Sequence, residues 1–86
     1  MKKIDFSAIE VKNIDGTVGT LNIKRDFANA LYVNSKEIEG NALGLKIYNT
    51  EGEVELTEQE EKIVKDYVPQ FYPSYLIQNS IINSIK

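Results

Sequence analysis

The sequence predicts an α+β fold in which an N-terminal β-hairpin is followed by helices, with two C-terminal helices packed on a small sheet. Apolar and polar residues alternate on both sides of Asp15-Gly16, which is typical of half-buried strands joined by a tight turn. From Arg25 onward the apolar residues recur every three to four positions, which indicates helices. A helix-start pattern at Thr57 and two later prolines divide the C-terminal part into two helices.

One domain accounts for a chain of 86 residues. The expected segments are a hairpin at residues 1–24, a helix at 25–36, short helix or strand elements at 41–56 and a two-helix part at 57–86. A chain this short buries only about 60 to 65% of the surface that its unfolded form exposes, so its stability margin is small. Association with a second copy would bury more.

The composition argues against several classes of protein. A mean hydropathy of -0.32 and the polar residues that interrupt the C-terminal apolar run argue against a membrane protein. Asp5 and Glu10 interrupt the N-terminal segment where a signal peptide would be apolar, so we expect a cytoplasmic location. The net charge is -3, and the acidic excess lies in residues 44–86. We expect no binding to nucleic acid, since phosphate contacts depend on Lys and Arg.

The turn of the hairpin decides which strand residues face each other. A two-residue loop at Asp15-Gly16 would divide the apolar residues between the two faces. A three-residue loop at 14–16, with Gly16 in the left-handed region, places Ile9 opposite Leu21 and Val11 opposite Gly19. We therefore expect the three-residue loop. Ile4 and Phe6 either extend the first strand or form a short turn before it.

The middle of the chain contains one clear helix and one ambiguous element. Residues 25–34 have helical apolar spacing, and Asp26 suits the positive end of the helix dipole. Residues 36–41 are expected to form a loop through Gly40. Residues 42–48 alternate like a strand but also share a helical face behind a possible Asn41 cap, and we favour a short helix.

A turn at 49–52 and a short strand at Val54 precede the helix with the clearest start. Thr57 and Glu60 fit a capping box, in which each side chain bonds the other residue's backbone amide. Pro69 is expected to end this helix, because the residue before a proline is pushed out of the helical region. The expected buried stripe is Ile63, Val64, Tyr67 and Val68, and the expected ion pairs are Glu58 with Lys62 and Glu61 with Lys65.

The last helix is expected to begin with Pro73 and to carry an apolar face about 160° wide. This face either packs within its own domain or forms an interface with a second copy or another protein. We favour the interface, because so small a domain has few elements to cover the face, and we expect Leu76 to be exposed. Asn79, Ser80 and Asn83 form an uncharged polar face. The predicted interface comprises Phe71, Tyr72, Tyr75, Leu76, Ile77, Ile81, Ile82 and Ile85.

Two clusters of side chains have compositions that occur in binding sites. The aromatic residues Tyr67, Phe71, Tyr72 and Tyr75 would suit base stacking only in a basic groove, so we assign them to the core and interface. Neighbouring carboxylates can bind a hard cation, but the spacing of a calcium loop is absent here. The acidic face, which we expect to be solvated, comprises Glu51, Glu53, Glu55, Glu58, Glu60 and Glu61.

The sequence offers little for catalysis. It has no histidine and no cysteine, and no Gly-x-Ser-x-Gly or phosphate-binding glycine motif. Acid-base and nucleophilic catalysis depend most often on these side chains. We therefore expect no enzyme, no cofactor and no metal site.

The segment GEVELTEQEEKIVKDYV from Gly52 to Val68, with Leu45–Tyr48 before it, resembles small uncharacterised proteins encoded in phages and prophages of gut bacteria. Those proteins are similarly short, acidic and free of cysteine. The resemblance implies a gene in a mobile element, near structural or assembly genes, and implies no activity and no site residue.

The expected function is a non-enzymatic protein-interaction module that associates with itself, as a homodimer or higher oligomer, through its C-terminal helix. Such a module would serve as an accessory or assembly component of a phage or mobile element. The alternative is an acidic inhibitor or regulator that presents Glu51 to Glu61 to a basic partner surface.

Overall fold

A computed structural model describes all residues from Met1 to Lys86. The elements in chain order are β1 (Lys2–Ile4), β2 (Ile9–Lys12), β3 (Val18–Leu21), α1 (Lys24–Asn34), α2 (Ile38–Asn49), β4 (Val54–Leu56), α3 (Glu58–Phe71) and α4 (Tyr75–Asn83). The strands form two antiparallel sheets of two strands each, β1 with β4 and β2 with β3. This is the α+β fold that the sequence predicts.

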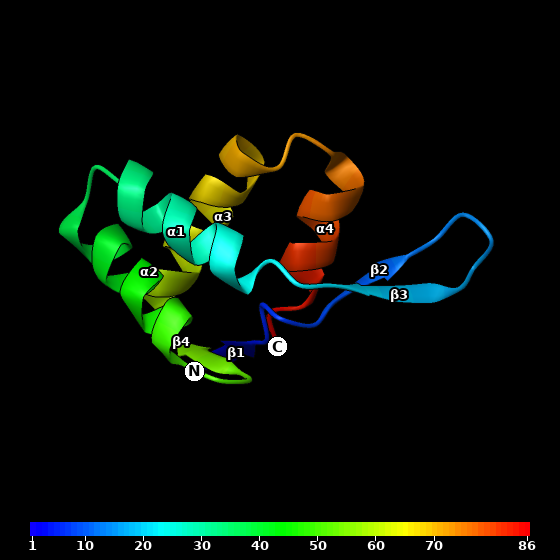
Figure 1. Cartoon of the computed structure of the whole chain (residues 1–86), viewed down its shortest axis with the longest axis horizontal. Helices are drawn as coiled ribbons and strands as arrows, with labels where there is room; N and C mark the ends of the chain where they lie inside the picture. The colour runs from blue at the N-terminus through cyan, green and yellow to red at the C-terminus, as the bar shows by residue number, and fades with distance from the viewer.

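The helices form a compact body, and the β2–β3 hairpin projects from it as an arm (Figure 1). α1 and α2 lie side by side at one end of the body, and α4 lies between α3 and the arm. The molecule is 41 Å long but only 24 and 21 Å across. The arm therefore presents most of its surface to solvent.

The arm has the predicted three-residue turn and the predicted register. Ile9 faces Leu21 and Val11 faces Gly19. The amide of Asn13 donates to the carbonyl of Thr17 at 2.8 Å, and Gly16 has a φ of 88°, which only glycine adopts at little cost. Thr17 in turn donates its hydroxyl and its backbone amide to the Asp15 carboxylate, and these two bonds hold the pKa of the Asp15 carboxyl below its ordinary value.

The N-terminal residues form a strand separate from the arm. Ile4 lies in β1, opposite Val54 of β4, and Phe6 lies in the turn between β1 and β2. Lys3 also exchanges two backbone hydrogen bonds of 2.8 Å with Lys86, so β1 lies between β4 and the last residue of the chain. The predicted hairpin at residues 1–24 thus combines the arm with a strand that belongs to the other sheet.

α2 begins earlier than predicted. The prediction of a loop at residues 36–41 is wrong from Ile38 onward, and only residues 35–37 connect α1 to α2. Gly40 is buried against the Ser35 side chain, so it permits a close approach and does not break the helix. The predicted Asn41 cap is also wrong, because Asn41 lies within α2 and its amide donates to the carbonyl of Tyr32 at 2.9 Å, near the end of α1. The preference for a helix at 42–48 is confirmed.

α3 begins as predicted but ends later. Thr57 and Glu60 form the capping box, with backbone-to-side-chain distances of 3.2 and 2.9 Å. The prediction that Pro69 ends the helix is wrong, since α3 continues to Phe71. A proline in the last turn removes only its own amide bond, and Tyr72 still donates to the carbonyl of Val68 at 2.9 Å.

The start of α4 and one ion pair also differ from prediction. α4 begins at Tyr75, after Ser74, whose carbonyl accepts the first helical hydrogen bond from Gln78. Pro73 therefore precedes the helix, and Ile85 follows its end. Of the two predicted ion pairs in α3, Glu61–Lys65 forms at 2.8 Å and Glu58–Lys62 does not.

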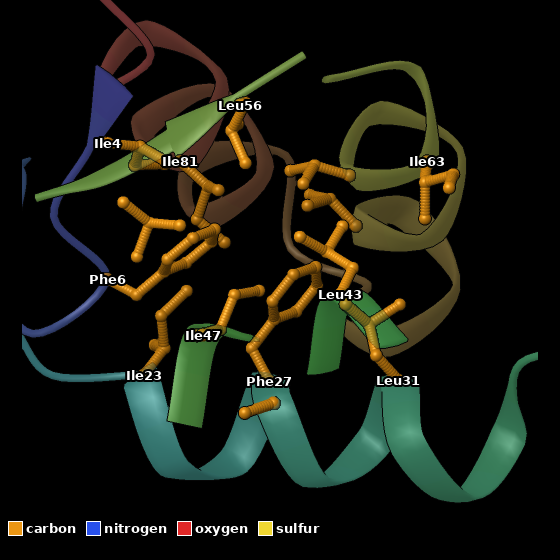
Figure 2. Packing of buried hydrophobic residues seen from close by; sticks show 14 of the residues in the cluster. Ile4, Phe6, Ile23, Phe27, Leu31, Leu43, Ile47, Leu56, Ile63 and Ile81 are labelled. Carbon is orange, nitrogen blue, oxygen red and sulfur yellow. The ribbon is translucent and has the colours of Figure 1, made fainter. Parts of the chain in front are cut away.

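The core lies between the helices and the β1–β4 sheet (Figure 2), and Ile9 adds one buried residue from β2. Phe27 of α1 is fully buried at its centre, and its ring is 5.2 Å from the ring of Phe6. Every element except β3 contributes at least one buried residue. The buried hydrophobic residues are Ile4, Phe6, Ile9, Ile23, Phe27, Ala28, Leu31, Leu43, Ile47, Val54, Leu56, Ile63, Val64, Val68 and Ile81.

Candidate protein-interaction surface

The apolar residues of the C-terminal segment divide into a packed group and an exposed group. Ile81 is fully buried, and Phe71, Tyr72, Ile77 and Ile85 are partly buried against the core. Ile82 is also partly buried. In contrast, Tyr75 is 80% exposed and Leu76 is 54% exposed. The part of the predicted interface that a partner can reach is therefore the beginning of α4.

The aromatic residues before α4 pack mainly against the protein itself. The ring of Phe71 is 5.8 Å from Phe27 and 5.5 Å from Tyr67, and the ring of Tyr72 is 6.3 Å from Phe27. Burial raises the pKa of the Tyr72 hydroxyl, and the negative charge of Asp26 raises it further. These aromatics fix the end of α3, and so they position the first turn of α4.

A groove of about 310 Å³ separates α4 from the arm. One wall is the α4 face that carries Leu76 together with the predicted uncharged polar residues Asn79, Ser80 and Asn83. The opposite wall comes from Asp5 and from the start of the arm, namely Ala8, Glu10 and Lys12. Sequence reasoning identified the polar face of α4, but it did not predict that β2 lies across from this face.

The groove contains few apolar side chains. Only Leu76 and Ala8 supply apolar side chains to its lining, and both are exposed. Ser80 is buried, and its hydroxyl donates to the carbonyl of Leu76 at 2.7 Å, one turn earlier in α4. The Ser80 hydroxyl is thus satisfied within its own helix, while Leu76 has an open side that an apolar residue of a partner can cover.

The tip of the arm carries further exposed apolar residues. Ile14, in the turn, is fully exposed, and Val18, at the start of β3, is largely exposed. Exposed single apolar residues are common on proteins, but a residue at the tip of a projecting arm is placed to reach a second molecule. The arm, the groove and the start of α4 together form the candidate interaction surface.

The acidic face is interrupted by lysines. Glu51, Glu53, Glu55 and Glu58 are exposed, but Lys3 lies opposite Glu55 in the β1–β4 register. Lys12 and Lys86 share the groove with Glu53. Glu61 is paired with Lys65 at 2.8 Å, and this bond, opposed by desolvation, holds the pKa of the Glu61 carboxyl below its ordinary value. No group of three or more acidic residues is arranged to hold a metal ion.

Glu60 links the capping box to α2. Partial burial would raise the pKa of its carboxyl, but a 2.9 Å bond from the Thr57 amide and a 2.9 Å ion pair with Lys46 together hold the pKa below its ordinary value. Lys46 also donates to the carbonyl of Glu55. The Glu60 carboxylate thus connects the start of α3 to Lys46 of α2, and Lys46 in turn connects both helices to β4.

This lowered pKa predicts a loss of stability in acid. A group whose pKa is lower in the folded state stabilises the fold above its unfolded pKa, about 4.3 for glutamate, and this stabilisation is lost as the pH falls through the folded pKa. We expect the free energy of unfolding, measured by urea denaturation from about pH 7 to about pH 3, to decline less steeply in Glu60→Gln than in the wild type. Glu58→Gln, which changes an exposed residue of the same turn, should retain the wild-type slope. Equal slopes in all three proteins would contradict this role of Glu60.

None of the helices is long and apolar enough to cross a membrane. Comparison of the chain with family models, curated proteins and solved structures finds no match.

Proposed function

We propose that this protein is a non-enzymatic protein-interaction module that associates with itself through the start of α4. The observation that carries the proposal is the position of Leu76, which is 54% exposed at the side of a groove while Ile77 and Ile81 of the same helix pack in the core. Tyr75 beside it is 80% exposed and adds an aromatic ring, a side chain that is enriched at protein interfaces.

The small size of the domain also supports self-association. Only 18 of 86 residues are buried, so a second copy would add apolar contact that the single chain lacks. The alternative, an acidic inhibitor of a basic partner, receives less support. Lysines from β1, from α3 and from the lining of the groove lie beside the acidic residues and reduce the negative charge of that face. A place among the accessory or assembly proteins of a phage or mobile element is proposed from the sequence resemblance alone.

The test is the effect of a charge at Leu76 on the solution mass. We expect Leu76→Glu to weaken self-association by about tenfold or more, because an apolar contact would be replaced by a carboxylate that must lose its water. Since Leu76 is exposed, the variant should retain the wild-type circular dichroism spectrum. Light scattering after size exclusion, over a range of protein concentrations, measures the change.

The matched control changes charge elsewhere on the surface. Replacing Glu51, Glu55 and Glu58 together by glutamine should leave the mass unchanged, since none of them lies on α4 or lines the groove. The proposal fails if Leu76→Glu associates as strongly as the wild type. A loss of association in the glutamine variant alone would transfer the interface to the acidic face.

A further inference from the structure

The arm has a strand edge with unused backbone hydrogen-bonding groups. In an antiparallel pair, residues alternate between those that bond the opposite strand and those whose backbone groups point away. Asn13 bonds Thr17, so by alternation Val11 and Ile9 bond inward, and Glu10 and Lys12 point outward. The sheet has only these two strands, and no turn or side chain bonds the outer groups of Glu10 or Lys12. A strand from another molecule can pair there.

The charges on this edge favour one particular occupant, a second copy of β2. Antiparallel pairing around Val11 places Glu10 of each copy opposite Lys12 of the other, and it joins the outward backbone groups of both strands. The neighbouring registers that keep the hydrogen bonds would place Glu10 opposite Glu10, or Lys12 opposite Lys12, and are disfavoured by repulsion. The charge pattern thus selects a single symmetric register.

Neither charge has an ion-pair partner within the chain. The two ion pairs of the structure join Lys46 to Glu60 and Lys65 to Glu61. Glu10 and Lys12 are both exposed, and they lie on the same side of β2, since strand residues two apart share a face. Both are therefore available to a second molecule.

The same register brings the tip of one arm to the groove of the other copy. Because β2 ends at Lys12 in each copy, the turn of one copy, which carries Ile14, comes next to the start of β2 in the other copy, where Ala8 precedes Ile9. Ala8 and Leu76 are the two apolar residues of the groove, and Ile14 is a fully exposed apolar residue. One arrangement therefore uses the free edge, the paired charges, the exposed tip and the exposed side of Leu76.

We propose that two copies of this protein associate through reciprocal antiparallel pairing of β2, which joins their arms into one four-stranded sheet and places Ile14 of each copy against the Ala8–Leu76 side of the other copy's groove. This inference rests on the proposed self-association and adds its geometry. Each copy contributes a strand to its partner's sheet and an apolar residue to its partner's groove.

Charge exchange between Glu10 and Lys12 tests the register. Glu10→Lys and Lys12→Glu each turn two attractive pairs into two repulsive ones, so each should weaken self-association by about fourfold or more. The double variant carrying both changes restores two attractive pairs and should recover the wild-type mass. Equal mixing of the two single variants should produce a heterodimer, because all four charges are then complementary.

Two further measurements separate this geometry from self-association of another kind. Glu39→Lys makes the same charge change as Glu10→Lys at an exposed residue of α2, away from the arm, and should leave the wild-type mass unchanged. In the dimer, the amides of Glu10 and Lys12 should exchange hydrogen slowly, whereas those of Val18 and Thr20, on the outer edge of β3, should exchange rapidly.

The outcomes distinguish this inference from the proposed function. A dimer that is lost in Leu76→Glu but unaffected by either single charge change would overturn the arm pairing and leave self-association through α4 standing. The arm pairing would also be overturned if the double variant did not regain the wild-type dimer mass. Slow amide exchange at Val18 and Thr20, in place of Glu10 and Lys12, would overturn it as well. A wild-type protein that stays monomeric at every concentration would overturn both.

Discussion

Replacing Phe27 by alanine is expected to cost about 3 to 5 kcal/mol of folding free energy, which is the largest effect of any single change considered for this chain. The ring is fully buried and contacts Phe6, Phe71 and Tyr72, at centroid distances of 5.2, 5.8 and 6.3 Å. Its removal leaves a cavity at the meeting point of α1, α3 and the segment before β2. A domain of this length has a total stability of only about 4 to 13 kcal/mol, so a large share would be lost.

Urea denaturation followed by circular dichroism measures this cost. Phe27→Leu is the matched control, because it keeps most of the apolar volume and should cost roughly 1 to 2 kcal/mol. If Phe27→Ala cost less than its leucine counterpart, the ring would not lie at the centre of the core.

Gly44→Ala is expected to have the second large effect on the free energy of unfolding, and the direction of that change tests the packing of α1 against α2. Alanine normally stabilises a helix interior over glycine by about 1 kcal/mol. At Gly44, however, a Cβ would lie 2.7 Å from the carbonyl oxygen of Ala28 and 2.9 Å from the amide nitrogen of Tyr32, both backbone atoms of α1. The two helices would have to separate, and overpacking of this kind costs about 1 to 3 kcal/mol or more.

The expected result is therefore a net destabilisation, seen as a lower midpoint in thermal or urea denaturation. Gly19→Ala is the control, because a Cβ there would meet its nearest neighbour at an ordinary 3.7 Å, and it should change stability little. A Gly44→Ala protein more stable than the wild type would show that α1 and α2 are not in close contact.

Local patterns predicted the elements whose structure is set by local chemistry. The register of the arm follows from alternation on both sides of Gly16, and the start of α3 follows from the side chains of Thr57 and Glu60. The predicted start of α2 and the predicted end of α3 were wrong, because there contacts between helices outweigh the local sequence signals. Gly40 resembles a loop residue in sequence, yet it lies within α2, and α3 continues past Pro69 while Phe71 packs against Phe27.

The candidate surface was predicted in part. The wide apolar face of the last helix predicted that some of its side chains would not pack within the domain. Leu76 is exposed, as expected, while Ile77 and Ile81 contribute to the core. The groove could not be predicted, because it depends on how β2 lies relative to α4, two segments more than sixty residues apart in sequence. The pairing of Lys3 with Lys86 was likewise not evident, since two exposed lysines carry no pairing signal.

The solution mass of the wild-type protein, determined by light scattering after size exclusion at several concentrations and two salt levels, tests the central claim most directly. The account predicts a concentration-dependent species of twice the 9.8 kDa chain mass that persists at the higher salt level, because apolar contacts and backbone hydrogen bonds are not screened as surface charges are. A mass of one chain under every condition would contradict self-association.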